Sequence, residues 1–387
     1  MARFLFVVPP LVGHVNPAAG VAAELTARGH EVAWAGHAEL LWRLAGPDAL
    51  VFSCALPPDL PARPAELKGP AALRFLWEDF LIPLADAMAP GVAAALDAFA
   101  PHVVVADQQA LAGGLLAEAR GLPWVTSATT SAELIDPLAG MPKVAAWVGS
   151  LLDGLRARIG GGAADPRISP HGVLAFTTRE LLGTATLPPR VRLVGPSIGT
   201  RPSTVDFPWE WLDPLRPTVL VSLGTANTAA GAGFLAAAAE AFAGRSVRAV
   251  IADPGGVLGE VPPNVLVRPQ VPQLPLLERV DAVVCHAGHN TVCESLWHGL
   301  PLVVAPIRDD QPIVAAQVVA AGAGLRLRFG RADAPRIAAA VEEVLTEPAY
   351  RRAAQALGAS FRAAGGSAAA AGYLEQLALE SLAHLGP

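Results

Sequence analysis

His14 has the side chain and the sequence position expected of a general base. It lies in the segment 13–17, GHVNP, which follows a short apolar run at the start of the chain. Asn16 as N-cap and Pro17 as the first helical residue predict a helix over residues 18–28, so His14 falls in a loop between a strand and a helix. Imidazole titrates near neutral pH and can take a proton during catalysis. A hydrogen-bonded surface histidine is the alternative interpretation.

Asp107 is a candidate partner for His14. It follows a buried strand predicted over Val103–Ala106, and the apolar run Phe4–Val8 predicts another strand of the same sheet. Both side chains would then lie at the carboxyl edge of that sheet, where doubly wound domains bind ligands. A carboxylate bonded to one ring nitrogen fixes the tautomer and stabilises the imidazolium that forms. Alternatively, Asp107 caps the helix that follows it.

The segment 285–294, CHAGHNTVCE, carries the richest set of polar groups. It follows a predicted buried strand and opens a helix, so free backbone N–H groups and the positive end of the helix dipole face outward. A diphosphate suits such a site. The residues expected to contact its oxygens are His286, Gly288, Asn290 and Thr291. Glu294, one turn into the helix, is placed to accept from ribose hydroxyls. Capping of the helix without a ligand is the plainer alternative.

A metal site is a further interpretation of the same segment, because Cys285, His286, His289 and Cys293 are all metal-ligating types. A junction between a strand and a helix turns some of these side chains into the core. No second group of ligands with matching spacing exists in the sequence. We therefore expect no metal and no other cofactor.

Two further loops carry weaker signals. Ser222, Gly224 and Thr225 follow or end the strand predicted over Thr218–Ser222 and could face phosphate. Asp310 and Gln311 come after a strand predicted over Leu302–Val304, and together they could hold two or three sugar hydroxyls. As a bare pattern, each loop could equally be a polar turn.

Apolar runs alternate with helical segments along the chain, which predicts an α/β fold. The runs are continuous rather than alternating, as expected of parallel strands buried on both faces. One series ends with Val173–Phe176 and a second begins at Thr218. We therefore predict two doubly wound domains, over residues 1–200 and 215–366, joined by a linker rich in Gly, Pro and Ser.

Composition limits the partners. The net charge is -6 and Lys and Arg do not cluster, which argues against nucleic acid or an anionic membrane as a partner. Three cysteines among 387 residues suit a reducing compartment, so we expect a cytoplasmic protein. No stretch of about 18 residues is free of charges and helix breakers, so we expect no membrane span. The expected partner is a small molecule.

Taken together, these motifs resemble those of the GT-B UDP-glycosyltransferases, especially bacterial members that glycosylate macrolides and other secondary metabolites. That family has a GHxNP loop after its first strand. Its donor signature runs WxPQ, HxGxN[ST]xxE, GxP and [DE]Q, in that order. The corresponding residues here are 270–273 (QVPQ), 286–294, 299–301 (GLP) and 310–311 (DQ). Because the whole series keeps its order, the resemblance is specific and spans most of the chain.

The resemblance implies a GT-B fold: two facing Rossmann-like domains with an interdomain cleft. The acceptor would bind to residues 1–200 and the donor to residues 215–366, with a C-terminal helix, 367–387, packed back on the first domain. It implies an inverting, metal-independent hexosyltransferase that uses a UDP- or TDP-sugar and a hydroxyl of a small hydrophobic acceptor such as a polyketide-type natural product. His14 would be the catalytic base and Asp107 its support. The family is also compatible with a homodimer.

The resemblance also implies substrate contacts. The implied nucleoside contacts are Gln270, Val271, Gln273 and Glu294. Gln270 replaces the family's base-stacking Trp, and an amide offers less apolar contact to a pyrimidine. The acceptor contacts implied in the first domain are Phe75, Trp77, Phe80, Leu134 and Trp147. Their character favours a hydrophobic aglycone, although core packing explains them nearly as well.

Two rival functions remain at this level, a sugar-nucleotide 2-epimerase of the same fold and a non-catalytic auxiliary homologue. Release of nucleoside diphosphate only in the presence of an acceptor would separate a transferase from an epimerase. A protein that merely binds nucleotide needs neither His14 nor Asp107.

Overall fold

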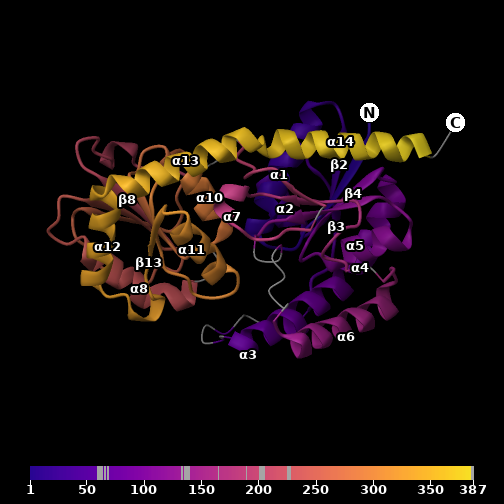
Figure 1. The fold of residues 1–387 in the computed structure, drawn as a ribbon, viewed down its shortest axis with the longest axis horizontal. Helices are drawn as coiled ribbons and strands as arrows, with labels where there is room; N and C mark the ends of the chain where they lie inside the picture. The colour runs from indigo at the N-terminus through magenta and orange to yellow at the C-terminus, as the bar shows by residue number, and fades with distance from the viewer. Residues whose placement is uncertain are drawn as a thin grey trace.

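The structure is a computed structural model that describes residues 1–58, 64, 67, 69–131, 134, 140–163, 165–188, 190–199, 205–224 and 228–384. Two α/β domains lie side by side, each built around a parallel sheet with helices on both faces (Figure 1). The predicted fold class, two doubly wound domains, is confirmed.

The first sheet has its strands in an order that reverses in the middle. Its strands, in spatial order, are β3 (Leu50–Ser53), β2 (Glu31–Gly36), β1 (Arg3–Val7), β4 (Val103–Asp107), β5 (Trp124–Ala128), β6 (Val173–Ala175) and β7 (Val191–Leu193). All pairings are parallel. The order reverses between β1 and β4, which pair directly, so the loops that follow them diverge to opposite sides and leave a crevice.

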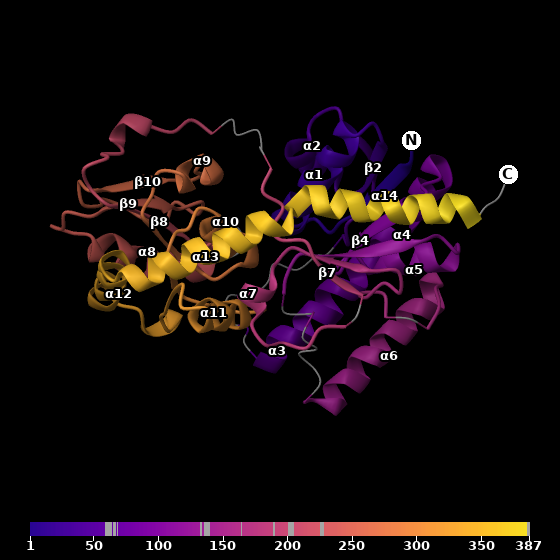
Figure 2. The same cartoon turned by 45° about the horizontal axis from the view of Figure 1, so that its top comes forward.

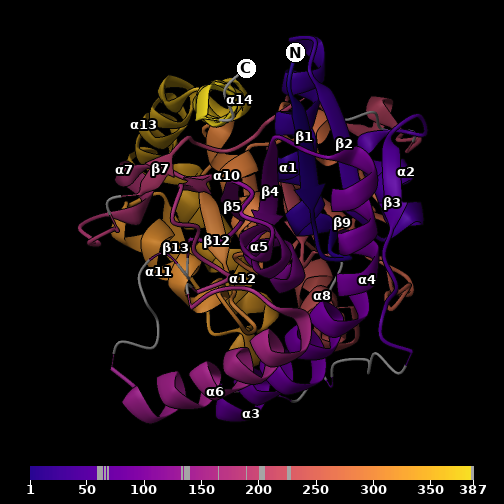
Figure 3. The ribbon, with the colours of Figure 1, turned by 90° about the vertical axis from the view of Figure 1, so that its right-hand side faces the viewer.

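Helices cover both faces of this sheet. They are α1 (Val12–Ala27), α2 (Ala38–Ala45), α3 (Gly69–Arg74), the π-helix η1 (Phe75–Leu81), α4 (Ile82–Phe99), α5 (Leu111–Ala119) and α6 (Pro142–Ile159). The short helix α7 (Arg179–Leu182) instead packs into the core of the second domain through Leu181. Helices α4, α5 and α6 bury one face, and α1 and α2 bury the other. Figures 1 and 3 show α3 and α6 extending beyond the sheet as an arm.

The helices α3, η1 and α4 run on without a break. Among the described residues, this continuous helix, Gly69–Phe99, is long and apolar enough to cross a membrane by length and composition. Its residues Leu84, Met88 and Val92 are fully buried in the core of the first domain. Part of its apolar character therefore belongs to the core of the first domain.

The second sheet repeats the same plan. Its strands, in spatial order, are β10 (Val265–Arg268), β9 (Arg248–Ala252), β8 (Thr218–Ser222), β11 (Ala282–Cys285), β12 (Leu302–Val304) and β13 (Gly324–Arg326). Its helices are α8 (Thr228–Ala241), α9 (Gln273–Leu277), α10 (His289–Trp297), α11 (Gln311–Ala320), α12 (Ala334–Thr346) and α13 (Pro348–Ala364). The order reverses between β8 and β11, which places a second crevice at the loops after these strands.

The chain passes between the domains twice. The final helix, α14 (Gly366–His384), leaves the second domain and lies along the first (Figure 2). There Ala370, Ala371 and Leu374 are buried together with residues of α1. The two passages are bonded to each other, because the Gly366 N–H donates to the Val194 carbonyl at 2.6 Å.

The aromatic segment that follows the linker belongs to the second domain. Phe207 is buried in its core, and residues Trp209–Trp211 form a short 3-10 helix, η3, against it. The guanidinium of Arg279 lies 4.6 Å from the centre of the Trp209 ring. Part of the predicted linker, residues 200–203, lies outside the described residues.

The predicted start of the first helix is wrong. Helix α1 begins at Val12, so His14 lies in its first turn and Pro17 lies inside the helix. A proline cannot donate to the carbonyl four residues before it. That carbonyl, of Gly13, accepts instead from Asn290 Nδ2 of the second domain at 2.6 Å. A contact between domains thus compensates for a proline that local sequence rules place at a helix start.

Candidate active site

His14 and Asp107 meet at the reversal point of the first sheet. His14 Nδ1 lies 2.9 Å from Asp107 Oδ1, and the Asp107 side chain is fully buried. The backbone N–H of Gln109 donates to the same oxygen at 2.8 Å. With Asp107 ionised, the Nδ1 proton is held toward it, which leaves the lone pair of the imidazole on Nε2. The geometry is that of an oriented general base.

Thr129 is a third member of this group that the sequence did not reveal. Its Oγ1 lies 2.8 Å from His14 Nδ1 and 3.3 Å from Asp107 Oδ2. The residue follows β5, which pairs with β4 so that Ser127 lies opposite Asp107. Thr129 could have been identified from the sequence only if β5 had been predicted to lie beside β4.

His286 lies at the reversal point of the second sheet, directly after β11. Its ring is packed between two glycines. A Cβ added to Gly224 would come within 2.8 Å of His286 Cε1, and one added to Gly288 within 2.3 Å of His286 Nε2. Burial lowers the pKa of His286 to about 4, with the nearby charge of Arg308 acting in the same direction and the Ser222 carbonyl opposing it. His286 is therefore neutral at physiological pH.

The other small residues predicted at this crevice follow β8. Ser222 is buried, and Gly224 has a φ of 71°, a conformation that favours glycine. The Gly224 N–H approaches Ser222 Oγ at 3.4 Å. Thr225, predicted to face phosphate, lies outside the described residues.

Helix α10 reaches across to the first domain. His289 Nε2 lies 3.1 Å from the carbonyl oxygen of Phe176, and Asn290 bonds to the Gly13 carbonyl as described above. Thr291 is buried, and its carbonyl accepts from Ser295 Oγ at 2.6 Å. The Nδ2 group of Asn290, which was predicted to contact phosphate, thus makes a contact between domains; its phosphate contact stays a prediction.

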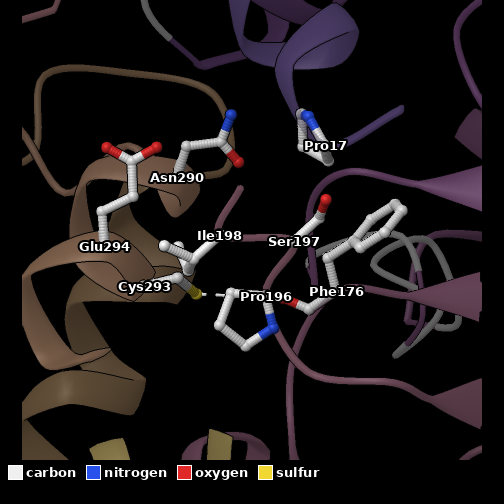
Figure 4. A pocket seen from close by; sticks show the side chains of 8 residues that line it. All are labelled: Pro17, Phe176, Pro196, Ser197, Ile198, Asn290, Cys293 and Glu294. Atoms are coloured by element: carbon white, nitrogen blue, oxygen red, sulfur yellow. Dashed lines mark hydrogen bonds between the residues drawn. The ribbon is translucent and has the colours of Figure 1, made fainter. Parts of the chain in front are cut away.

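A small pocket lies between α1, α10 and the chain segments that follow β6 and β7 (Figure 4). It is lined by Pro17, Phe176, Pro196, Ser197, Ile198, Asn290, Cys293 and Glu294. Because residues of both domains line the pocket, its size depends on the position of one domain relative to the other.

The predicted nucleoside residues come together in part. Gln273, the first residue of α9, donates through Nε2 to Glu294 Oε2 at 2.5 Å, and Glu294 is 2% exposed. Val271 packs against the core of the second domain. Gln270 is exposed. Local packing therefore holds the Glu294 carboxylate in place before any ligand arrives.

The two predicted sugar-binding residues differ in what they contact. Asp310 Oδ2 accepts from Thr130 Oγ1 of the first domain at 2.5 Å. Burial raises the pKa of Asp310, although Thr130, His289 and His14 act in the opposite direction. The Gln311 amide oxygen accepts from the backbone N–H groups of residues 307 and 308, at 2.8 and 3.1 Å. That oxygen therefore holds the turn, while Asp310 lies at the domain interface close to His14.

The predicted acceptor residues lie in or beside the first core. Trp77 is 4% exposed and lies under the guanidinium of Arg167, and Leu134 is also buried. These two have packing roles. Phe75 and Phe80 on η1 and Trp147 on α6 are half-buried, and the last two pack against the first core. They remain the better candidates to contact a ligand.

The residues considered for a metal cluster are enclosed by protein. Cys285 and Cys293 are free thiols, and burial raises the pKa of Cys285 to about 12. Within the part of the chain that the structure describes, no group of three or more His, Cys, Asp or Glu side chains is arranged to hold a metal ion.

Known proteins are similar to this chain in sequence and in fold. Residues 234–377 match the family model described as "Erythromycin biosynthesis protein CIII-like, C-terminal domain". The chain is 32% identical to 4'-demethylrebeccamycin synthase of Lentzea aerocolonigenes, over 90% of this chain and 93% of that protein. It is 30% identical to demethyllactenocin mycarosyltransferase of Streptomyces fradiae, over 97% and 87% of the two chains.

Solved structures of glycosyltransferases are also similar to this chain. The calicheamicin glycosyltransferase CalG4 superposes with a TM-score of 0.80 at 25% identity and covers 100% of both chains. The spinosyn rhamnosyltransferase SpnG, solved with thymidine diphosphate, superposes with a TM-score of 0.77 at 25% identity, over 96% of this chain and 100% of the other.

The two facing domains and these likenesses define a glycosyltransferase of the GT-B fold. The chain belongs to the UDP-glycosyltransferase family, among relatives that act on natural products.

Proposed function

We propose that this glycosyltransferase moves a sugar from a UDP- or TDP-sugar to a hydroxyl group of a small hydrophobic acceptor, with inversion at the anomeric carbon and without a metal ion. The observation that carries the proposal is the hydrogen-bonded pair of His14 and Asp107, at 2.9 Å, on the domain that faces the loop containing His286. A protein that only bound nucleotide would need no such pair.

The proposed reaction is a direct displacement. His14 Nε2 takes the proton of the acceptor hydroxyl while that oxygen forms its bond to the anomeric carbon. The bond from that carbon to the β-phosphate oxygen breaks, and its electron pair leaves with the nucleoside diphosphate. Asp107 stabilises the imidazolium that results. Attack on the face opposite the leaving group inverts the anomeric configuration.

The donor side of the proposal rests on the loops after β8 and β11. The start of α10 supplies backbone N–H groups and the positive end of a helix dipole for an anion. A structural relative was solved with thymidine diphosphate, and a sequence relative is named for transfer of mycarose. Glu294, held by Gln273, would accept from the ribose hydroxyls.

The test is to incubate the purified protein with UDP- and TDP-sugars and a panel of polyketide-like acceptors. We expect nucleoside diphosphate to be released only when an acceptor is present, together with a product heavier by one sugar residue in mass spectrometry. NMR of the product should show the inverted anomeric configuration, and activity should survive a chelating agent. Release without acceptor, or epimerised donor instead of product, would contradict transfer.

A further inference from the structure

A leaving diphosphate carries negative charge that the protein must offset if no metal does. The acidic residues Asp310 and Glu294 at the donor crevice cannot supply positive charge. His286 cannot supply it either, because this side chain is neutral above a pKa of about 4. Among the described residues of the loops after β8, β11 and β12, the remaining cation is Arg308.

The turn that carries Arg308 is held in a defined shape. Asp309, the next residue, has a φ of 57°, a conformation that residues other than glycine rarely adopt. The side-chain oxygen of Gln311 accepts from the backbone N–H groups of Ile307 and Arg308. These two bonds and the positive φ hold the backbone from Ile307 to Gln311 in one turn.

This turn buries the guanidinium of Arg308. The side chain is 8% exposed, although it stands on a loop at the edge of a sheet. Its neighbour Asp309 has its carboxylate 4.0 Å from Arg308 Nε, at the limit of an ion pair. β11 and β12 pair directly, and Ala305 N–H donates to the Cys285 carbonyl at 2.8 Å, so the loops bearing Arg308 and His286 are adjacent. Arg308 is close enough for its charge to act on His286.

We propose that Arg308 binds the diphosphate of the nucleotide-sugar donor and supplies the positive charge that stabilises it as it leaves. Arginine stays protonated at all physiological pH values, and its planar fork matches two phosphate oxygens. His286 then serves as a neutral hydrogen-bonding group beside it. This proposal rests on the proposed function, since it takes a nucleoside diphosphate as the leaving group.

The test compares ligands that differ only in phosphate. Isothermal titration calorimetry would measure the affinities of the diphosphates UDP and TDP and of the nucleosides uridine and thymidine. The proteins compared are the wild type, Arg308→Met and Arg308→Lys. The matched control is Arg328→Met, which removes the same charge from an exposed position after the neighbouring strand β13. Each protein is first checked by circular dichroism.

In Arg308→Met we expect a loss of roughly ten- to a hundredfold in affinity for the diphosphate, from charged hydrogen bonds, with nucleoside affinity unchanged. Arg308→Lys, which keeps the charge but not the fork, should lose less, and it carries the test if the methionine variant does not fold. Equal diphosphate affinity in wild type and Arg308 variants, or an equal loss in Arg328→Met, would overturn the proposal while the proposed function stands. A wild-type protein that binds neither diphosphate would overturn both.

Discussion

His14 and Asp107, 93 positions apart in the chain, form a pair that the sequence could predict. Each comes where an apolar strand ends, and parallel strands of one sheet bring such ends to one edge. Thr129 was missed because its role depends on which strand lies beside β4, and packing decides that. The raised pKa of Asp310 could not be predicted from the sequence either, because it is caused by burial of this side chain between the two domains.

Removal of the imidazole is the most direct residue-level test. We expect His14→Ala to lose about 10² to 10⁴ in turnover, the usual worth of general base catalysis, while binding nucleoside diphosphate normally. Asp107→Asn should lose less, because the imidazole remains but its protonated form is no longer stabilised by a charge. The measurement is turnover at saturating donor with folded variants. Turnover of His14→Ala near the wild-type value would exclude the proposed base.

Thr129 allows a finer test of the same group. In Thr129→Val the shape is kept but the hydroxyl is lost, so His14 Nδ1 and the buried Asp107 each lose a polar neighbour. Loss of one hydrogen bond, about 0.5 to 1.5 kcal/mol, should lower kcat roughly two- to tenfold and move the acid limb of the pH–rate profile. Thr129→Ser should restore both. A serine variant as impaired as the valine variant would point to packing alone.

At the scale of elements, the structure contains strands within one residue of the predicted bounds Phe4–Val8, Val103–Ala106, Val173–Phe176, Thr218–Ser222 and Leu302–Val304. The sequence did not predict how the loops close. Local rules put the start of α1 at Pro17, whereas the Gly13 carbonyl is satisfied by Asn290 from the other domain. Gln311 was predicted to hold a sugar hydroxyl, and this stays a prediction; its side-chain oxygen also closes the turn before α11. The error at the start of α1 concerns a carbonyl group whose hydrogen-bond partner lies 277 residues away in the chain.

The contact between α9 and α10 gives an element-level prediction. Gln273 holds the Glu294 carboxylate, which is proposed to accept from the ribose hydroxyls of the donor. Removal of that carboxylate should therefore weaken donor binding by roughly 1.5 to 3 kcal/mol, the cost of a charged hydrogen bond. Glu294→Ala is the variant, and the donor dissociation constant is the measurement. Gln273→Ala should show a smaller loss, because the carboxylate remains. Wild-type donor affinity in folded Glu294→Ala would remove this residue from the donor site.

For the whole molecule, buried histidine links stability to pH. The unfolded chain binds a proton on histidine below about pH 6.5, whereas folded His286 stays neutral down to about 4. The unfolded state therefore holds more protons in this range, and the free energy of unfolding should fall by roughly 3 kcal/mol from this residue as pH drops from 6.5 to 4. Urea unfolding across that range is the measurement. A His286→Gln variant should show a shallower fall; an equally steep one would assign the effect elsewhere.

The placement of α14 matters for the order in which the protein is made. During translation the first domain leaves the ribosome first, and the second domain follows it. Residues 366–384, which supply Ala370, Ala371 and Leu374 to the core of the first domain, leave the ribosome only after both. Until these residues emerge, the first domain exposes an apolar surface beside α1, although the second domain can already fold. We expect nascent chains halted before residue 366 to bind chaperones through that surface, and chains extended past residue 384 to release them; crosslinking that is equal at both lengths would refute this.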